Sequence, residues 1–312
     1  MQKIKASIEA FLGQCQRENK PPLLVLLGPT ASGKTALSLE LAEEFGCEII
    51  SSDSRQVYRH MDIGTDKILA DSRRGIPHFL IDVVNPDERF TVADFKCGAE
   101  TAAGEILARG KLPMLVGGTG LYIRAVTQNF KFPEENKEIR VQLEADMAAI
   151  VAEKGRKEAG VFLHKKLGRL DPASAAKIHP RNIPYVVRAL EIFLGTGRTK
   201  DDRRDTPKYS CLMLGLSFPR EKLFERIDAR VETQIERGLV EETKKLLAMG
   251  YGEDLPSMRS LGYREIIQHL EGALTIRAAA ELIKKNTRDF AKRQMTWFKK
   301  DAEVTWICGD TA

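Results

Sequence analysis

The feature that most constrains the fold is a glycine-containing loop that directly follows a wholly apolar run. The run, LLVLL at residues 23–27, has the composition of a strand buried on both faces. Helical periodicity begins at residue 34 and continues to residue 45. The loop between them matches G-x-x-x-x-G-K-[ST] and consists of Gly28, Pro29, Thr30, Ala31, Ser32, Gly33, Lys34 and Thr35. Strand, loop and helix in this order predict a P-loop.

A P-loop binds phosphate for physical reasons that these residue types satisfy. Its glycines let backbone amides turn inward around phosphate oxygens, and the helix N-terminus adds a favourable partial charge. Lys34 supplies a mobile positive charge, and the hydroxyl of Thr35 suits a Mg2+ ion. Such loops are typical of nucleotide-binding and ATP-binding proteins, so the loop alone leaves the phosphate compound open.

Further strand-like runs alternate with helical stretches along the chain. They are CEII at 47–50, HFLIDVV at 78–84, LPMLVGG at 112–118 and CLMLGLSF at 211–218, and a helix is expected around 91–109. Buried strands that alternate with helices favour a parallel sheet covered by helices. The sequence therefore predicts an α/β fold: a P-loop NTPase-like parallel sheet flanked by helices.

One long segment departs from this alternation. Residues 131–205 are rich in Ala, Glu, Lys and Arg and contain no strand-like run. They are expected to form an inserted all-helical subdomain, which leaves residues 1–130 and 206–312 as the core that contains the P-loop. After residue 218 the chain is expected to be mainly helical.

Polar residues follow two of the predicted strands. Asp53 comes directly after the strand that begins at residue 47, and Thr119 follows the strand within LVGGTGLY at 115–122. Ligands of open parallel sheets bind beyond the carboxyl ends of the strands, so both should face the P-loop. Asp53 could accept a proton from a nucleophile or could cap the turn that follows it. The strand before Thr119 lacks the acidic residue that many P-loop nucleotidases use for Mg2+, which weakens an ATPase interpretation.

Basic residues recur in the segment 281–300. Lys284, Arg288 and Lys292 are spaced by four and fall along one stripe of a helix. Such a stripe suits contact with a phosphate backbone. A solvated helix face is the commoner explanation of a charge run and is favoured from this segment alone.

Composition excludes several classes of protein. The chain has 312 residues, a net charge of +5 and a pI of about 8.8, compatible with a polyanionic partner without requiring one. Its five cysteines are scattered, which argues against a zinc site or a disulfide framework and favours a cytoplasmic location. No apolar run approaches the roughly 18 residues of a membrane span, so no membrane partner is expected.

Four separated motifs together resemble one family. GPTASGKT, SSDSRQVY with MDIGT, LVGGTGLY and KRQMTWF occur in the order and spacing of the tRNA dimethylallyltransferases. The segment PSMRSLGYR at 256–264 is also similar to that family. The resemblance runs from about residue 22 to about residue 306, so it covers nearly the whole chain.

The resemblance implies an enzyme and a mechanism. Members transfer the dimethylallyl group of dimethylallyl diphosphate to the exocyclic N6 amine of the adenosine 3′-adjacent to the anticodon in tRNA, releasing pyrophosphate. By similarity the P-loop binds the diphosphate, with Lys34 and a Mg2+ ion at Thr35 offsetting its charge. Asp53 is the implied general base and Thr119 orients it. Arg230 is the implied diphosphate-binding arginine, and Arg226 is the other candidate.

The resemblance also implies contacts with the anticodon stem-loop. Separately, we expect a monomeric protein. At Arg181 the sequence departs from the family pattern, so this residue either supplies a charge to RNA or belongs to a stretch that only packs. The implied RNA contacts are Asp53, Ser54, Arg55, Gln56, Thr119, Arg140, Arg181, Arg259, Gly262, Tyr263, Arg264, Lys292, Arg293, Gln294, Trp297 and Lys299.

Three alternatives share part of this pattern. An isopentenyltransferase for free adenine nucleotides would have the same P-loop, aspartate and GGTG segment, but the helical insertion and KRQMTWF favour tRNA. A P-loop kinase of a small metabolite would turn over ATP. A nucleotide-gated RNA-binding module without catalysis would not need Lys34, Thr35, Asp53 and Thr119 together.

Overall fold

A computed structural model describes residues 2–133, 136–199 and 205–309. The chain divides into two compact units, Met1–Thr127 with Pro207–Ala312 and Gln128–Thr206. The smaller unit begins and ends within a few residues of the helical insertion predicted at 131–205. Each unit is described by itself.

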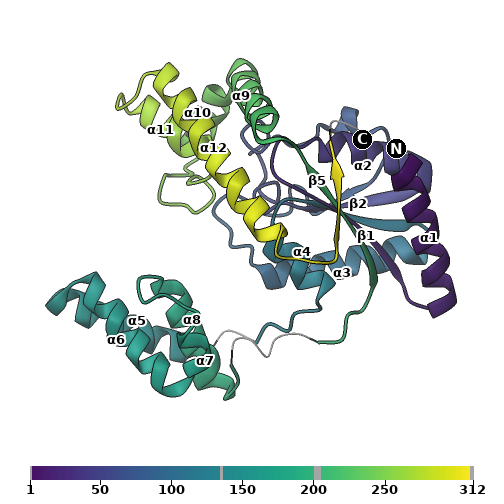
Figure 1. Ribbon diagram of the computed structural model, residues 1–312. Coiled ribbons are helices and arrows are strands. Elements are labelled where there is room, and N and C mark those ends of the chain that lie inside the picture. Colours follow the sequence, from purple (N-terminus) through teal and green to yellow (C-terminus); the bar gives the residue numbers. More distant parts are fainter. Residues whose placement is uncertain (1, 134–135, 200–204, 310–312) are drawn as a thin grey trace. The chain divides into compact units, whose positions relative to one another are not determined.

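The larger unit is built on a parallel sheet whose strand order, over the described residues, is β3-β2-β4-β1-β5-β6. Every pairing is parallel, with Leu24 of β1 opposite Met114 of β4 on one side and Leu212 of β5 on the other. This confirms the predicted P-loop-like α/β class (Figure 1). The strands are β1 (Pro22–Leu27), β2 (Cys47–Ser52), β3 (His78–Phe79), β4 (Leu112–Gly117), β5 (Ser210–Ser217) and β6 (Val304–Cys308).

Helices cover both faces of the sheet because successive side chains of β1 point to opposite sides. Leu23, Val25 and Leu27 pack in one core with α3 (Val92–Ala108) and α4 (Gly120–Thr127). Leu24 and Leu26 pack in a second core with α1 (Gln2–Glu18) and α2 (Lys34–Phe45). A continuous apolar strand therefore stabilises both layers, as LLVLL predicted.

Two predicted helices begin and end where local chemistry requires. α2 ends at Gly46, whose φ of 64° gives the left-handed cap that glycine adopts without strain. α3 begins after Thr91, which exchanges hydrogen bonds with Asp94 in a capping box. Their bounds agree with the ranges 34–45 and 91–109 expected from the sequence.

One strand prediction needs correction, and one strand was not predicted. HFLIDVV at 78–84 forms only the two-residue β3, because Leu80 and Asp82 adopt left-handed φ values of 60° and 58° that take the chain out of the sheet. The amides of Val83 and Val84 donate instead to the carbonyl of Val57. In the C-terminal part, expected to be mainly helical, β6 adds an edge strand beside β5.

A helical layer extends beyond the sheet in the larger unit, with its own apolar core. Tyr263, Met61 and Ile283 are buried in this core together with residues of four helices. In Figure 1, α9 lies beside α12, in agreement with their packing contacts. The elements are the short 3-10 helix η1 (Ala70–Arg73), α9 (Arg220–Glu236), α10 (Leu239–Ala248), α11 (Tyr263–Leu270) and α12 (Ile276–Phe298).

All the secondary structure of the smaller unit is helical within its described residues. Leu143, Leu163, Leu167, Val186 and Leu190 form its core. Its elements are α5 (Lys137–Lys154), α6 (Arg156–Leu170), α7 (Pro172–Ala175) and α8 (Ile183–Thr196). Across the described parts of both units, no helix has the length and apolar composition that crossing a bilayer requires.

Candidate active site

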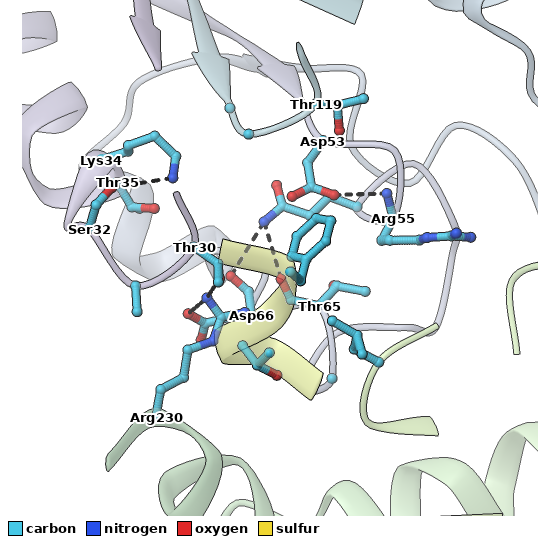
Figure 2. Close-up of a pocket in the computed structure, with 18 of the residues that line it drawn as sticks. Thr30, Ser32, Lys34, Thr35, Asp53, Arg55, Thr65, Asp66, Thr119 and Arg230 are labelled. Atoms are coloured by element: carbon cyan, nitrogen blue, oxygen red, sulfur yellow. Dashed lines mark hydrogen bonds and ion pairs between the residues drawn. The ribbon is translucent and has the colours of Figure 1, made fainter. Parts of the chain in front are cut away.

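A cavity of about 1010 Å3 lies in the larger unit where β1, β2 and β4 end. This is the edge of a parallel sheet at which ligands bind, because the connecting loops converge there. The cavity is lined by the P-loop, the segment after β2, the segment after β4, and residues of α9 and α12. Figure 2 shows the P-loop residues Lys34 and Thr35 and, after β2, Asp53 near Thr119.

The path of the P-loop depends on its two glycines. At Gly28, with φ of 152°, a Cβ would lie 2.8 Å from the carbonyl oxygen of Leu216. Gly33 has φ of 84° and lies immediately before α2. Ala31 also adopts a left-handed φ, 61°, without being glycine. Holding a residue with a Cβ there costs about 1 kcal/mol, so contacts outside the loop must maintain its shape.

Lys34 is directed at its own loop. Its Nζ donates to the carbonyl oxygens of Pro29 at 2.6 Å and Gly28 at 3.1 Å. Burial lowers the pKa of Lys34 to about 8; the Asp53 carboxylate opposes this shift and the Arg230 guanidinium adds to it. Lys34 is therefore mainly cationic at neutral pH, although part of this charge is offset only by carbonyl dipoles. An entering anion would satisfy it better.

Asp53 caps a turn with one oxygen and presents the other to the cavity. Its Oδ1 accepts from the amide of Arg55 at 2.8 Å. Within the described residues, Oδ2 has no protein hydrogen-bond partner, and Asp53 lines the cavity. The two sequence interpretations, cap and proton acceptor, are thus compatible with one side chain.

Thr119 fixes the loop that carries Asp53. Its Oγ1 accepts from the amide of Ser54 at 3.1 Å, and its own amide donates to the carbonyl of Ser52 at 3.2 Å. These two bonds join the segment after β4 to the segment after β2. Thr119 therefore acts on Asp53 through the backbone around it.

The two candidate diphosphate arginines both reach the P-loop from α9. Arg230 donates from Nη1 to the Thr30 hydroxyl at 2.7 Å and pairs with Asp66 at 3.4 Å. Arg226 donates from Nε to the carbonyl of Ala31 at 2.8 Å, with its guanidinium 4.9 Å from the ring of Phe218. Both arginines line the cavity.

Many of the predicted RNA contacts also line this cavity. They come from the segment after β2, the segment after β4, the segment before α11, α11 itself and α12. These residues are Asp53, Ser54, Arg55, Gln56, Thr119, Arg259, Arg264, Arg293 and Gln294.

The other predicted contacts lie elsewhere. Lys292, Trp297 and Lys299 are exposed on α12 or at its C-terminal end. Arg140 and Arg181 belong to the smaller unit, where Arg140 donates to Glu144 at 3.0 Å. Arg181 is exposed.

The side chain of Tyr263 needs a different interpretation. It is fully buried and donates its hydroxyl to Glu242 at 2.7 Å, next to the buried Gly262. A side chain with no exposed surface has nothing to offer RNA in this structure. The Tyr263 ring also lies where a Cβ on Gly64 would be, so the ring packs directly against the backbone of Gly64, in the segment before η1.

The stripe predicted on α12 is largely paired with carboxylates. Lys284 is buried and its Nζ lies 2.5 Å from a carboxylate oxygen of Glu232 on α9. Arg288 donates from Nε to Asp228 of α9 at 2.9 Å. The favoured interpretation of the stripe as a solvated face is wrong for these two residues, because α9 covers them. Lys292 is exposed.

Sequence reasoning missed one carboxylate that shapes the cavity. Glu242 of α10 accepts from the amides of Ile63 at 2.8 Å and Gly64 at 3.1 Å. It thereby holds the segment in which Thr65 and Asp66 line the cavity. No local pattern marks Glu242, because its partners lie almost 180 residues earlier in the chain.

Comparisons with known proteins agree on one family. The family model described as IPP transferase matches residues 56–301, and the model described as isopentenyl transferase matches residues 21–81. A tRNA dimethylallyltransferase of Symbiobacterium thermophilum is 47% identical, over 92% of this chain and 89% of that protein. The corresponding protein of Thermomicrobium roseum is 45% identical, over 92% of this chain and 86% of its own length.

Two solved structures are similar to the chain. A tRNA isopentenylpyrophosphate transferase of Bacillus halodurans is 43% identical with a TM-score of 0.69, covering 93% of this chain and 90% of that one. A eukaryotic dimethylallyltransferase acting on tRNA is 29% identical with a TM-score of 0.79, covering 93% of this chain and 74% of that one. With a family model that matches most of its length and relatives this similar, the chain belongs to the IPP transferase family.

Proposed function

We propose that the chain is a tRNA dimethylallyltransferase. It transfers the dimethylallyl group of dimethylallyl diphosphate to the N6 amine of the adenosine 3′-adjacent to the anticodon, releasing pyrophosphate. The observation that carries this proposal is a single cavity that combines a P-loop with the carboxylate of Asp53. The curated relatives named tRNA dimethylallyltransferase support it.

The chemistry assigns distinct roles to the two sides of the cavity. The adenine N6 forms a bond to C1 of the dimethylallyl group as the C1–O bond to diphosphate breaks. The N6 proton passes to Oδ2 of Asp53, and the electron pair of the broken bond leaves with pyrophosphate. Because N6 is a weak nucleophile, the reaction gains most from stabilising the leaving diphosphate. Lys34 does this from the P-loop.

Arg230 is the better candidate for the second diphosphate-binding cation. It lies close enough to Lys34 to lower the pKa of that lysine, and its donation to Thr30 places it beside the loop. Arg226 contacts Ala31 and packs over the ring of Phe218, which suits a role in holding the loop. Arg230 would therefore add charge where negative charge develops.

Thr35 would hold a Mg2+ ion that offsets the charge of the diphosphate. The donor set fits this ion only in part: Thr35 and Asp53 line the cavity, and the described residues contain no group of three or more His, Cys, Asp or Glu placed to hold a metal ion. Mg2+ keeps several waters and commonly takes substrate phosphates as ligands. The remaining ligands would thus come from the diphosphate and water.

The RNA would enter with its target base out of the loop stack, as base-modifying enzymes require. Arg259, Arg264 and Arg293 line the cavity and suit contacts to phosphates around that base. Arg140 and Arg181 of the smaller unit would contact the same RNA. The eukaryotic structure that acts on tRNA supports this substrate.

The protein would work as a monomer in the cytoplasm. Free cysteines throughout the described chain are compatible with a reducing compartment. Light scattering of the purified protein tests the monomer, since a mass near 34.9 kDa is expected.

Radiolabelled dimethylallyl diphosphate and Mg2+ test the reaction directly. One reaction receives unmodified tRNA with adenosines after the anticodon, and the other receives free AMP. Label in tRNA, mapped to the adenosine 3′ of the anticodon, is the expected result. Label only in AMP would show that the enzyme prenylates free nucleotides instead of tRNA. Turnover of ATP without label transfer would indicate a kinase.

A further inference from the structure

The amide of Gln294 connects two loops that lie on opposite sides of the proposed reaction. Its Oε1 accepts from the amide of Thr30 in the P-loop at 2.9 Å. Its Nε2 donates to the carbonyl oxygen of Gly118, in the segment after β4, at 3.0 Å. Only 8% of Gln294 is exposed, so the side chain is directed at the protein.

Both bonds are at points where a small displacement would reach the reacting groups. Thr30 precedes Ala31, the P-loop residue with a left-handed φ of 61°, so this part of the loop needs support from outside. Gly118 precedes Thr119, whose hydroxyl holds the amide of Ser54 beside Asp53. A shift at either end of the Gln294 amide would therefore move the diphosphate loop relative to Asp53.

We propose that Gln294 is a positioning residue that sets the spacing between the diphosphate-binding loop and the loop of the general base. The inference rests on the proposed function, since it assigns Gln294 to the same reaction. It departs from the family-based expectation that Gln294 contacts RNA. Its neighbour Arg293 is exposed and lines the cavity. Two successive residues of α12 thus differ: the charge of Arg293 is available to a ligand, whereas the amide of Gln294 binds the protein.

The first test replaces Gln294 with Met, which keeps the length of the side chain and loses both hydrogen bonds. Because misplacement of about 1 Å can cost about 100-fold in rate, single-turnover transfer in Gln294→Met should fall between about tenfold and 100-fold. The dissociation constant for tRNA should stay within about twofold of wild type. Arg293→Ala is the matched control and should weaken tRNA binding instead. Weaker tRNA binding by Gln294→Met with a normal rate would overturn the proposal.

A second test uses the close packing between Gln294 and Gly118. A Cβ on Gly118 would lie 2.3 Å from Nε2 of Gln294, so Gly118→Ala should displace the amide and slow transfer. In the Gln294→Ala background that space is vacant. Gly118→Ala should then cost little beyond the loss already caused by Gln294→Ala. Losses that multiply independently would contradict the assignment.

Two further measurements keep the outcome clear. Thermal unfolding of each variant shows whether a loss of rate comes from a loss of fold. The wild-type enzyme separates the two claims. Absence of transfer by wild type would refute the proposed function, whereas active wild type with an equally active Gln294→Met would refute only the role of Gln294.

Discussion

The charge of Lys34 gives the site a pH dependence that can be measured. Burial lowers its pKa from the ordinary 10.5 to about 8, and a bound diphosphate favours the charged form. Pyrophosphate binding should therefore be unaffected by this group below pH 8 and weaken above it, by up to about tenfold per pH unit. Calorimetric titration of wild type between pH 7 and 9.5 measures the slope.

Lys34→Arg is the control, because the guanidinium stays charged across this range. Pyrophosphate titrates identically in both experiments, so the difference between the two slopes belongs to Lys34. Equal slopes would refute the assignment. The sign for folding is opposite: between pH 8 and 10.5 the unfolded chain holds this proton and the folded chain does not, so the free energy of unfolding rises with pH there.

Asp53 has two roles that one pair of variants can separate. Asn at this position keeps an oxygen for the amide of Arg55 but cannot take a proton, so Asp53→Asn should slow transfer by about 100- to 10,000-fold with unchanged thermal stability. Asp53→Ala also loses the cap and should lower the free energy of unfolding by about 1 kcal/mol. A rate for Asp53→Asn close to wild type would exclude Asp53 as the base.

Local sequence patterns are sufficient to predict the position of some of these residues in the site, but not of others. The P-loop and the position of Asp53 follow from strand composition and from the rule that ligands bind at the carboxyl ends of parallel strands. Gln294 and Glu242 cannot be placed in this way. Their partners are 264 and about 180 residues away, and such pairs are set by packing that no short segment encodes.

At the scale of elements, α9 and α12 form one acidic–basic pair. Taken alone, the stripe of α12 favours a solvated helix face over a contact with RNA. Asp228 and Glu232 of α9 lie opposite it and neutralise Arg288 and Lys284. A periodic charge pattern therefore predicts a face of a helix, but the partner of that face depends on tertiary structure.

This pairing predicts different effects for two arginines of one helix. Arg288→Ala should lower the free energy of unfolding by about 1 kcal/mol, because a partly exposed bidentate pair with Asp228 is lost. It should leave the salt dependence of tRNA binding unchanged. Arg293→Ala should leave stability nearly unchanged and reduce the slope of log K against log salt by about one. Filter binding at several salt concentrations and thermal melts would decide, and an equal change of slope in both variants would contradict the pairing.

At the scale of the whole molecule, the two units have separate cores. The helical nature of the smaller unit was predictable from a composition without strand-like runs. Its packing, with Leu163 and Leu167 fully buried, was not. The lengths and positions of β3 and β6 were not predictable either. β3 is short because left-handed residues follow it directly, and β6 is a short run after a long helix that joins the sheet only at its edge.

A separate core predicts that the smaller unit folds alone. A fragment of residues 128–206 should give a helical circular dichroism spectrum and a cooperative thermal transition. Leu163→Ala in the fragment should abolish or strongly lower that transition, because removing a fully buried leucine costs about 2–5 kcal/mol. Exposed Val141→Ala is the matched control and should melt like the parent fragment. A fragment without a transition would show that this unit needs the larger one to fold.

The edge strand β6 restricts how α12 can respond to a ligand. The helix is held at its start by packing against α11 and just beyond its end by the five residue pairs between β5 and β6. Tilting or sliding as a rigid rod would break that ladder. Adaptation to RNA along α12 is therefore confined to rotamers of its exposed side chains, and structures with and without tRNA should superimpose α12 on the sheet.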